Sequence, residues 1–159
     1  MTAIEVVLRQ IDQAFDHKSW HGTNLRGSIR GLGAAEAAWR PQPDRHNIWE
    51  LVLHAAYWKY TVLRRIDGRD RGSFPLAGSN FFMRPESESF TEAQWKADVG
   101  ILVDTHRNLR ACIAGLSEER LESGTSGTLR ILDLVIGIAA HDLYHAGQIQ
   151  TLKRLQSNG

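Results

Sequence analysis

Two histidines four residues apart, His141 and His145, are the residues whose types and spacing most directly suggest chemistry. Side chains at positions i and i+4 of an α-helix lie one turn apart on the same face, so two imidazoles there can bind one ion. The same face carries Leu134, Ile138 and Leu152, which predicts that both rings point into the protein. Buried imidazole nitrogens need partners, and a metal ion is one such partner.

A third ligand is predicted on another helix. His54 lies between Leu51 and Trp58 in an apolar helical stripe, so its ring is also expected to face the core. Helical bundles build metal sites from inward side chains of facing helices. Three histidines leave positions on an ion open for water or substrate, as in catalytic metal sites. The residues alone leave two interpretations open, a metal site and a group of histidines satisfied by hydrogen bonds.

Several polar or aromatic residues are candidates for orienting a ligand or contacting a substrate. Glu50 lies one turn before His54, and Gln148 lies one turn beyond His145. The other three candidates are Trp58, His21 and His106.

The remaining polar residues near these motifs are expected to have structural roles. His17 and His46 are interpreted as structural or solvent-facing, because one lies at a charged helix end and the other precedes a helix cap. Asp142 points about 100° away from His141 around the helix, so it is expected at the surface or opposite a neighbouring helix. Cys112 is the single cysteine, which excludes an internal disulfide and a multi-cysteine zinc site. Its side chain is expected to be a small buried hydrophobic group.

Four amphipathic helices are needed to position these residues. The periodicity predicts one helix over residues 2–32 with a break near Gly22, and others over 48–66, 91–115 and 128–156. Residues 34–45 are expected to be extended, and 117–127 to form a polar loop. Asn47 is the predicted cap of the second long helix, with Glu50 completing a capping box.

The connection over residues 68–90 suggests the topology. A helix of about twenty residues is about 30 Å long, and a comparable number of extended residues can cross that length. A tight antiparallel hairpin would not need such a segment. The sequence therefore predicts an all-α four-helix bundle in up-down-down-up order, with a long crossover between the second and third helices.

Composition excludes several other classes of protein. The chain has 159 residues, which fits one domain over 1–159, and 19 basic and 18 acidic side chains give a net charge of +1. This balance does not indicate a nucleic-acid partner. The longest apolar stretch, residues 134–140, is too short to span a membrane, and no signal peptide is visible. A cytoplasmic location is expected.

Two segments, 47–54 and 141–149, resemble the signature regions of the DinB/YfiT superfamily, the second through its His-x-x-x-His followed by Gly-Gln-Ile. The segments 20–22 and 39–41 are similar to one of its subgroups. The resemblance implies an up-down-down-up bundle and a divalent metal, zinc or nickel first, held by His54, His141 and His145. It also implies a homodimer. The known activities centre on metal-activated low-molecular-weight thiols, as in bacillithiol transferases and mycothiol-dependent isomerases.

The function expected on these grounds is that of a metal-dependent enzyme with a small-molecule substrate, in which the metal activates a thiol for S-transfer or activates water. Two alternatives stay open: a metal-dependent hydrolase, and a non-catalytic metal- or ligand-binding protein of the stress response. The additional C-terminal domain of the mycothiol-dependent isomerases has no counterpart in these 159 residues, so that particular activity is not expected.

Overall fold

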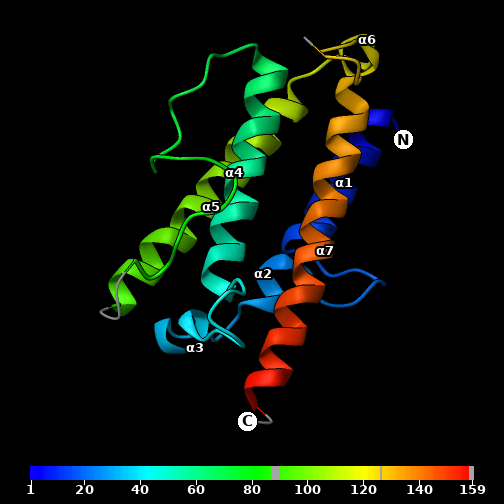
Figure 1. The fold of residues 1–159 in the computed structure, drawn as a ribbon. Coiled ribbons are helices and arrows are strands. Elements are labelled where there is room, and N and C mark those ends of the chain that lie inside the picture. Colours follow the sequence, from blue (N-terminus) through cyan, green and yellow to red (C-terminus); the bar gives the residue numbers. More distant parts are fainter. Residues whose placement is uncertain (87–89, 126, 158–159) are drawn as a thin grey trace.

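Four long helices run alongside one another in the computed structural model, which describes residues 1–86, 90–125 and 127–157 (Figure 1). They are α1 (Ala3–Phe15), α4 (Ile48–Asp67), α5 (Glu92–Ala114) and α7 (Ile131–Ser157). Three short helices join them: α2 (Leu25–Ser28), α3 (Ala34–Ala38) and α6 (Glu118–Glu122). Residues 87–89 and 126 of the predicted connections, and 158–159 of the predicted domain, lie outside the described residues.

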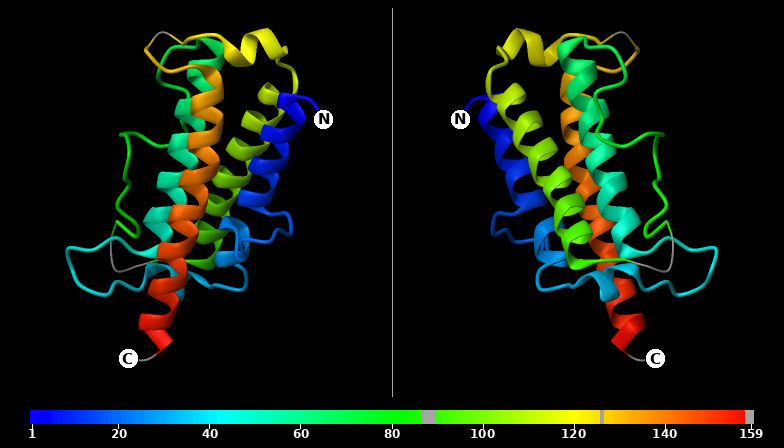
Figure 2. Two further views of the ribbon diagram at one scale, coloured as in Figure 1. Left: turned by 90° about the vertical axis from the view of Figure 1, so that its right-hand side faces the viewer. Right: turned by 90° about the vertical axis from the view of Figure 1, so that its left-hand side faces the viewer.

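The long crossover lets two successive long helices, α4 and α5, run in the same direction. α4 and α5 both run from the end of the bundle near α2 and α3 to the end near α6, and α1 and α7 run the opposite way (Figures 1 and 2). After α4, residues 69–86 return along the outside of the bundle toward the end where α5 begins (Figure 2). The predicted up-down-down-up four-helix bundle is thus confirmed. None of the helices in the described ranges is both long enough and apolar enough to span a membrane.

Local hydrogen bonds fix where the long helices begin. The Asn47 side chain accepts from the Glu50 N–H at the start of α4, and Thr91 forms a capping box with Gln94 at the start of α5. α4 ends at Gly68, whose φ of 71° is the left-handed conformation that glycine adopts at little cost. The predicted capping box of α4 is only half formed, because the Glu50 carboxylate binds other groups described below.

The N-terminal third differs from the prediction of one long kinked helix. α1 ends at Phe15, and only a single turn, α2, forms where the second half was expected. Asn24 caps that turn by accepting from the Gly27 N–H. Gly22 at φ 99° and Gly31 at φ 77° divert the backbone on either side of α2, so the periodic apolar residues there pack from short segments. Two predicted loops also contain a helical turn, α3 within 34–45 and α6 within 117–127.

The bundle core is divided by a polar layer. One buried apolar cluster surrounds Trp49 and Leu102, and a second surrounds Ile113 and Val135 toward the α6 end. Between them along their helices lie buried polar side chains. These are Lys59 on α4, His106 on α5, and Asp142 and His145 on α7. Burying a polar group costs free energy unless the group is hydrogen-bonded or paired. The side chains of this layer must therefore have polar partners as well as fill the core.

Candidate metal centre

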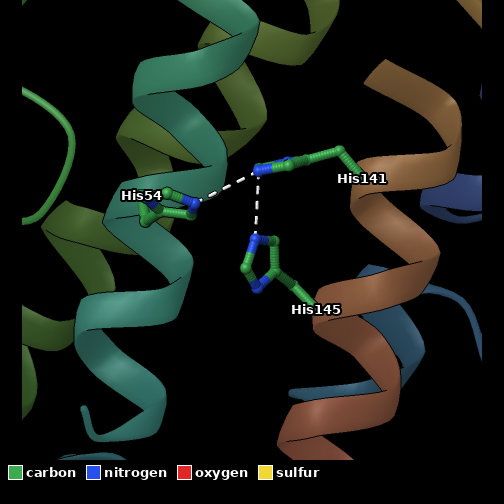
Figure 3. A group of neighbouring side chains, drawn as sticks. All are labelled: His54, His141 and His145. Carbon is green, nitrogen blue, oxygen red and sulfur yellow. Dashed lines mark hydrogen bonds between the residues drawn. The ribbon is translucent and has the colours of Figure 1, made fainter. Parts of the chain in front are cut away.

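Three histidines from two helices converge at the level of the polar layer. His54 projects from α4, and His141 and His145 project from successive turns of α7 (Figure 3). Nε2 of His141 lies 3.1 Å from Nε2 of His54 and 3.0 Å from Nε2 of His145. Four-coordinate zinc with Zn–N of about 2.0–2.1 Å places its nitrogen ligands roughly 3.3 Å apart, so these separations are close to those of a ligand set.

In two of the rings, those of His54 and His145, the Nδ1 nitrogen is hydrogen-bonded to a carbonyl oxygen outside the triad. Nδ1 of His54 lies 3.0 Å from the main-chain oxygen of Asn80, and Nδ1 of His145 lies 2.6 Å from Oε1 of Gln148. A carbonyl oxygen can only accept, so each Nδ1 must donate a proton. In a neutral imidazole the other nitrogen then carries a lone pair. Nε2 of both His54 and His145 therefore presents a lone pair toward His141.

These lone pairs cannot both be satisfied by His141. Its neutral ring has one N–H at most, so Nε2 can donate to one neighbour and must oppose the lone pair of the other. A cation among the three Nε2 atoms removes this conflict, because each nitrogen then donates its lone pair to the ion. The three residues can each offer one ligand atom, and these atoms all lie within 4.8 Å of one another. The donor set therefore fits a divalent metal ion.

Burial keeps all three rings in the neutral form that metal binding requires. The exposed fraction of His54 is 6% and that of His145 is 4%. Desolvation lowers the pKa of His54 to about 4, and desolvation followed by the charges of the neighbouring histidines lowers that of His141 to about 3. Desolvation also lowers the pKa of His145. At neutral pH the protons do not compete with a metal for these nitrogens.

The crossover segment supplies one wall of the site. Asn80, which has a positive φ of 67°, directs its main-chain oxygen to His54 and accepts a 2.9 Å hydrogen bond from Trp58 through its side chain. The Phe81 ring stacks on His54 at 4.0 Å between ring centroids and on His46 at 3.7 Å. The crossover therefore holds the His54 ring in two ways, by a hydrogen bond at Nδ1 and by a stack against its face.

A buried ion network lies behind this wall. Glu50 is 1% exposed. Its carboxylate accepts two hydrogen bonds from Arg40, of 2.5 and 3.0 Å, and one of 2.8 Å from Nδ1 of His46. Its carboxylate also accepts from the Arg84 N–H at 3.2 Å. Burial alone would raise the pKa of Glu50, but these hydrogen bonds outweigh it and place the pKa below its ordinary value. Glu50 thus anchors the segment before α4 and orients His46.

A cavity of about 960 Å³ opens beside the three histidines. Its walls come from α4, α7, the segment before α4 and the crossover. Besides the triad, the lining residues are Pro41, Arg45, His46, Leu51, Trp58, Asn80, Phe81, Tyr144, Gly147, Gln148, Thr151 and Leu152. This volume is in the range of sites for small molecules, and the mainly apolar walls with a few convergent polar groups are typical of such sites.

A buried ion pair joins the two helices that carry the histidines. Lys59 on α4 hydrogen-bonds to Asp142 on α7, and each side chain is 1% exposed. Burial raises the pKa of Asp142, although the Lys59 ammonium opposes the shift. Asp142 is therefore an interhelical partner, one of the two placements expected for it. Oδ1 of Asp142 and Nδ1 of His141 are buried without a hydrogen-bond partner among the described residues.

The structure separates the remaining candidates. Gln148 and Trp58 lie at the triad as described, and Glu50 reaches the pocket only through His46. His21 is exposed and pairs with Ser19 at 2.8 Å. His106 is buried against Phe15, with ring centroids 3.6 Å apart, and does not line the cavity.

Two residues differ in part from their expected roles. Cys112 is half-buried rather than fully buried, and its thiol donates to Asp67 at 3.0 Å; desolvation and that carboxylate raise its pKa to about 12. His46 is half-exposed, but it also lines the pocket and belongs to the ring stack. Sequence reasoning missed this role of His46, and it missed Asn80, Phe81, Arg40, Arg45 and Tyr144. An aromatic residue inside a long loop, such as Phe81, is the signal that could have identified that wall.

The fold and the site together define a four-helix bundle with an inward histidine triad beside an open pocket. The family model of the DinB superfamily matches residues 19–149, and the chain belongs to this superfamily. A crystal structure of a conserved protein from Enterococcus faecalis is similar over 100% of this chain and 99% of that one, with a TM-score of 0.69 and 14% sequence identity. At this identity the similarity supports the fold alone. A search of curated proteins found no match.

Proposed function

We propose that this protein binds a divalent metal, zinc or nickel first, through Nε2 of His54, His141 and His145, and acts on a small molecule in the adjacent pocket. The observation that carries the proposal is the convergence of three Nε2 atoms, two of which are fixed as lone-pair donors by Asn80 and Gln148. A divalent ion held by neutral imidazoles lowers the pKa of a bound thiol or water by several units.

The residues around the triad would perform the rest of the chemistry. Trp58, Phe81 and Leu152 provide apolar walls that hold a substrate and exclude water. Nδ1 of His46 is hydrogen-bonded to Glu50, which leaves Nε2 of that ring free to accept a hydrogen bond from a substrate in the pocket. In S-transfer, the thiol sulfur forms a bond to an electrophilic carbon while the leaving group departs with its electron pair.

Metal analysis tests the centre itself. Wild-type protein prepared with added zinc or nickel should carry about one equivalent, and His54→Ala and His145→Ala should lose most of it, because two imidazoles bind far more weakly than three. His21→Ala is the matched control, since His21 is exposed and outside the pocket. Wild-type protein without metal, or a loss of metal in the control alone, would overturn the proposal.

A panel of cellular thiols tested with monochlorobimane separates the activities. Metal-dependent conjugation with one thiol supports S-transfer. Activity on ester or amide substrates but not with thiols would favour the hydrolase, which the open pocket also accommodates. A metal-bound protein with neither activity would support the non-catalytic binder.

We also propose that α7 forms a homodimer interface. Its outer face exposes Ile136 at 41% and Tyr144 at 65%, and Gly137 and Gly147 on the same helix have open space where a Cβ would lie. An exposed apolar helix face of this kind is typical of an interface. Because Tyr144 and Gly147 also line the pocket, a partner on this face would adjoin the pocket mouth.

A further inference from the structure

Arg45 is the one side chain with a fixed charge among the described residues that line the pocket. The other lining groups are imidazoles, aromatic and aliphatic side chains, the hydroxyls of Tyr144 and Thr151 and two amides, and no carboxylate of the described residues lines the cavity. A pocket that combines a divalent ion with a guanidinium has a positive potential, and apolar walls strengthen that field by excluding water. The pocket is therefore electrostatically suited to an anion.

The backbone at Arg45 is held in place by the buried network. Its N–H donates to the Gln42 oxygen at 3.0 Å, and its own oxygen accepts from Arg40 Nη1 at 2.5 Å. Arg40 is in turn fixed on the buried Glu50 carboxylate. The main chain of Arg45 is thus tied to the buried Glu50 network, which fixes the point beside the pocket from which the side chain starts.

The guanidinium itself is available to a ligand. Its side chain is 65% exposed, and the ion-pair partner that the described residues give it, Asp44, lies 3.5 Å away and is 69% exposed. Exposed ion pairs of this kind contribute little to stability, so the guanidinium can exchange Asp44 for another anion. A ligand carboxylate could form two parallel hydrogen bonds to the same fork.

We propose that Arg45 selects ligands that have an anionic group, such as a carboxylate, at the end away from the atom that binds the metal. The preferred substrates are then acidic thiols with an apolar middle section, which lies against Trp58, Phe81 and Tyr144. This inference rests on the proposed metal-dependent function, because the metal fixes one end of the ligand. The alternative to this role is that Arg45 is a solvated side chain on a surface loop and contacts no ligand.

Cobalt-substituted protein gives a binding readout that does not depend on turnover, because thiolate coordination to Co(II) produces a charge-transfer band in the near ultraviolet. The probes are mercaptopropionate and mercaptohexanoate, each compared with its uncharged amide. Wild-type protein should bind at least one acid more tightly than its amide by about five- to tenfold, as expected for a charge-assisted contact at a partly exposed site. Added salt should reduce the preference.

Variants then assign the preference to Arg45 rather than to the metal charge. Arg45→Gln should remove the acid preference without changing amide binding, and Arg45→Lys should keep part of it. Asp44→Asn should increase it, because the competing carboxylate is gone. Arg107→Gln is the matched control: Arg107 is 70% exposed, pairs with Asp104 at 2.9 Å and lies outside the pocket lining.

The outcomes separate this inference from the proposed function. A protein that takes up no Co(II) at the triad overturns the metal-dependent function and this inference with it. Cobalt uptake with equal affinity for acids and amides, or with an acid preference that survives Arg45→Gln, overturns the role of Arg45 alone. Cobalt uptake with no thiolate band for any of the four probes also contradicts it, since the favoured acidic thiols are among them.

Discussion

The Nδ1 nitrogens of the histidines determine what their Nε2 nitrogens can do. Gln148 is one turn beyond His145, and its amide oxygen fixes both the tautomer and the orientation of that ring. Asn80 performs the same role for His54 with a main-chain oxygen. Partners of this kind raise the basicity of a ligand and hold it in the geometry that the ion requires.

Gln148→Leu should therefore weaken metal binding by about ten- to a hundredfold while leaving the three ligands in place. Competition with a chromophoric chelator would measure the change. Gln150→Leu is the control, because Gln150 is on the same helix but contacts Thr23 outside the site. Equal metal affinities in wild type and Gln148→Leu would contradict the role assigned to the amide.

His106 should make the folded state sensitive to acid. Desolvation, followed by the charges of Lys59 and Arg110, lowers its pKa to about 2, whereas an unfolded histidine titrates near 6.5. As pH falls below about 6.5, the unfolded chain takes up a proton that folded His106 does not, so stability decreases. Between pH 7 and pH 5 this one residue should cost about 2 kcal/mol.

Urea unfolding of metal-free protein at the two pH values would measure this loss. His106→Phe keeps a flat ring against Phe15 and cannot be protonated, so its stability should fall less between pH 7 and pH 5 than that of wild type. An identical loss in the variant would show that His106 does not contribute to the acid sensitivity.

At the scale of the helices, the pair between Lys59 and Asp142 fixes α4 against α7 beside the triad. Lys59 lies five residues after His54, and Asp142 is the neighbour of His141, so the pair sets the register in which the two ligand helices meet. A buried ion pair is costly to break from one side, because the remaining charge is left without a partner.

Lys59→Met should destabilise the protein by about 3–5 kcal/mol, since Asp142 would remain buried and unpaired. The double variant Lys59→Met with Asp142→Leu should recover most of that loss, because both charges are removed together. Urea unfolding of the single and double variants forms the test. A single variant with wild-type stability would mean that the pair does not clamp the helices.

The elements that sequence predicts well are those governed by helical periodicity. α5 and α4 were predicted to within a residue or two because apolar spacing and the caps Thr91 and Asn47 agree. The segment after Phe15 was predicted less well, because the apolar spacing resumes in phase at Leu25 although α1 has already ended at Phe15 and the backbone turns at Gly22. Lys59 had a signal that was not used: it occupies a core position between Ala55 and Val62.

The parts of the site that sequence could not predict depend on where loops fold. The triad followed from helical phase, and Gln148 from its spacing to His145. By contrast, Asn80 acts through its backbone oxygen, which any residue possesses. His46 lies at the pocket between the Glu50 carboxylate and the Phe81 ring, which the crossover brings against it. Contacts between two irregular segments leave no periodic pattern.

At the scale of the whole molecule, α7 has apolar side chains on two faces. Its inner face packs against α1 and α4, and its outer face exposes Ile136 and Tyr144. A polar outer face would be expected for a helix that meets only solvent on that side. The dimer proposed above accounts for the outer face by placing the same helix of a second copy on it, which is the usual symmetry of such contacts.

Ile136→Glu should convert a dimer to a monomer, because two carboxylates would be buried near the symmetry axis. Light scattering after size-exclusion chromatography would measure the mass, and circular dichroism should show unchanged helix content, since Ile136 is 41% exposed within the single chain. Val6→Glu is the matched control, because Val6 is an apolar residue of similar exposure, 48%, on a different helix, α1. A wild-type protein that stays monomeric when concentrated, or a dimer that Ile136→Glu leaves intact, would contradict this interface and require another explanation for the apolar surface of α7.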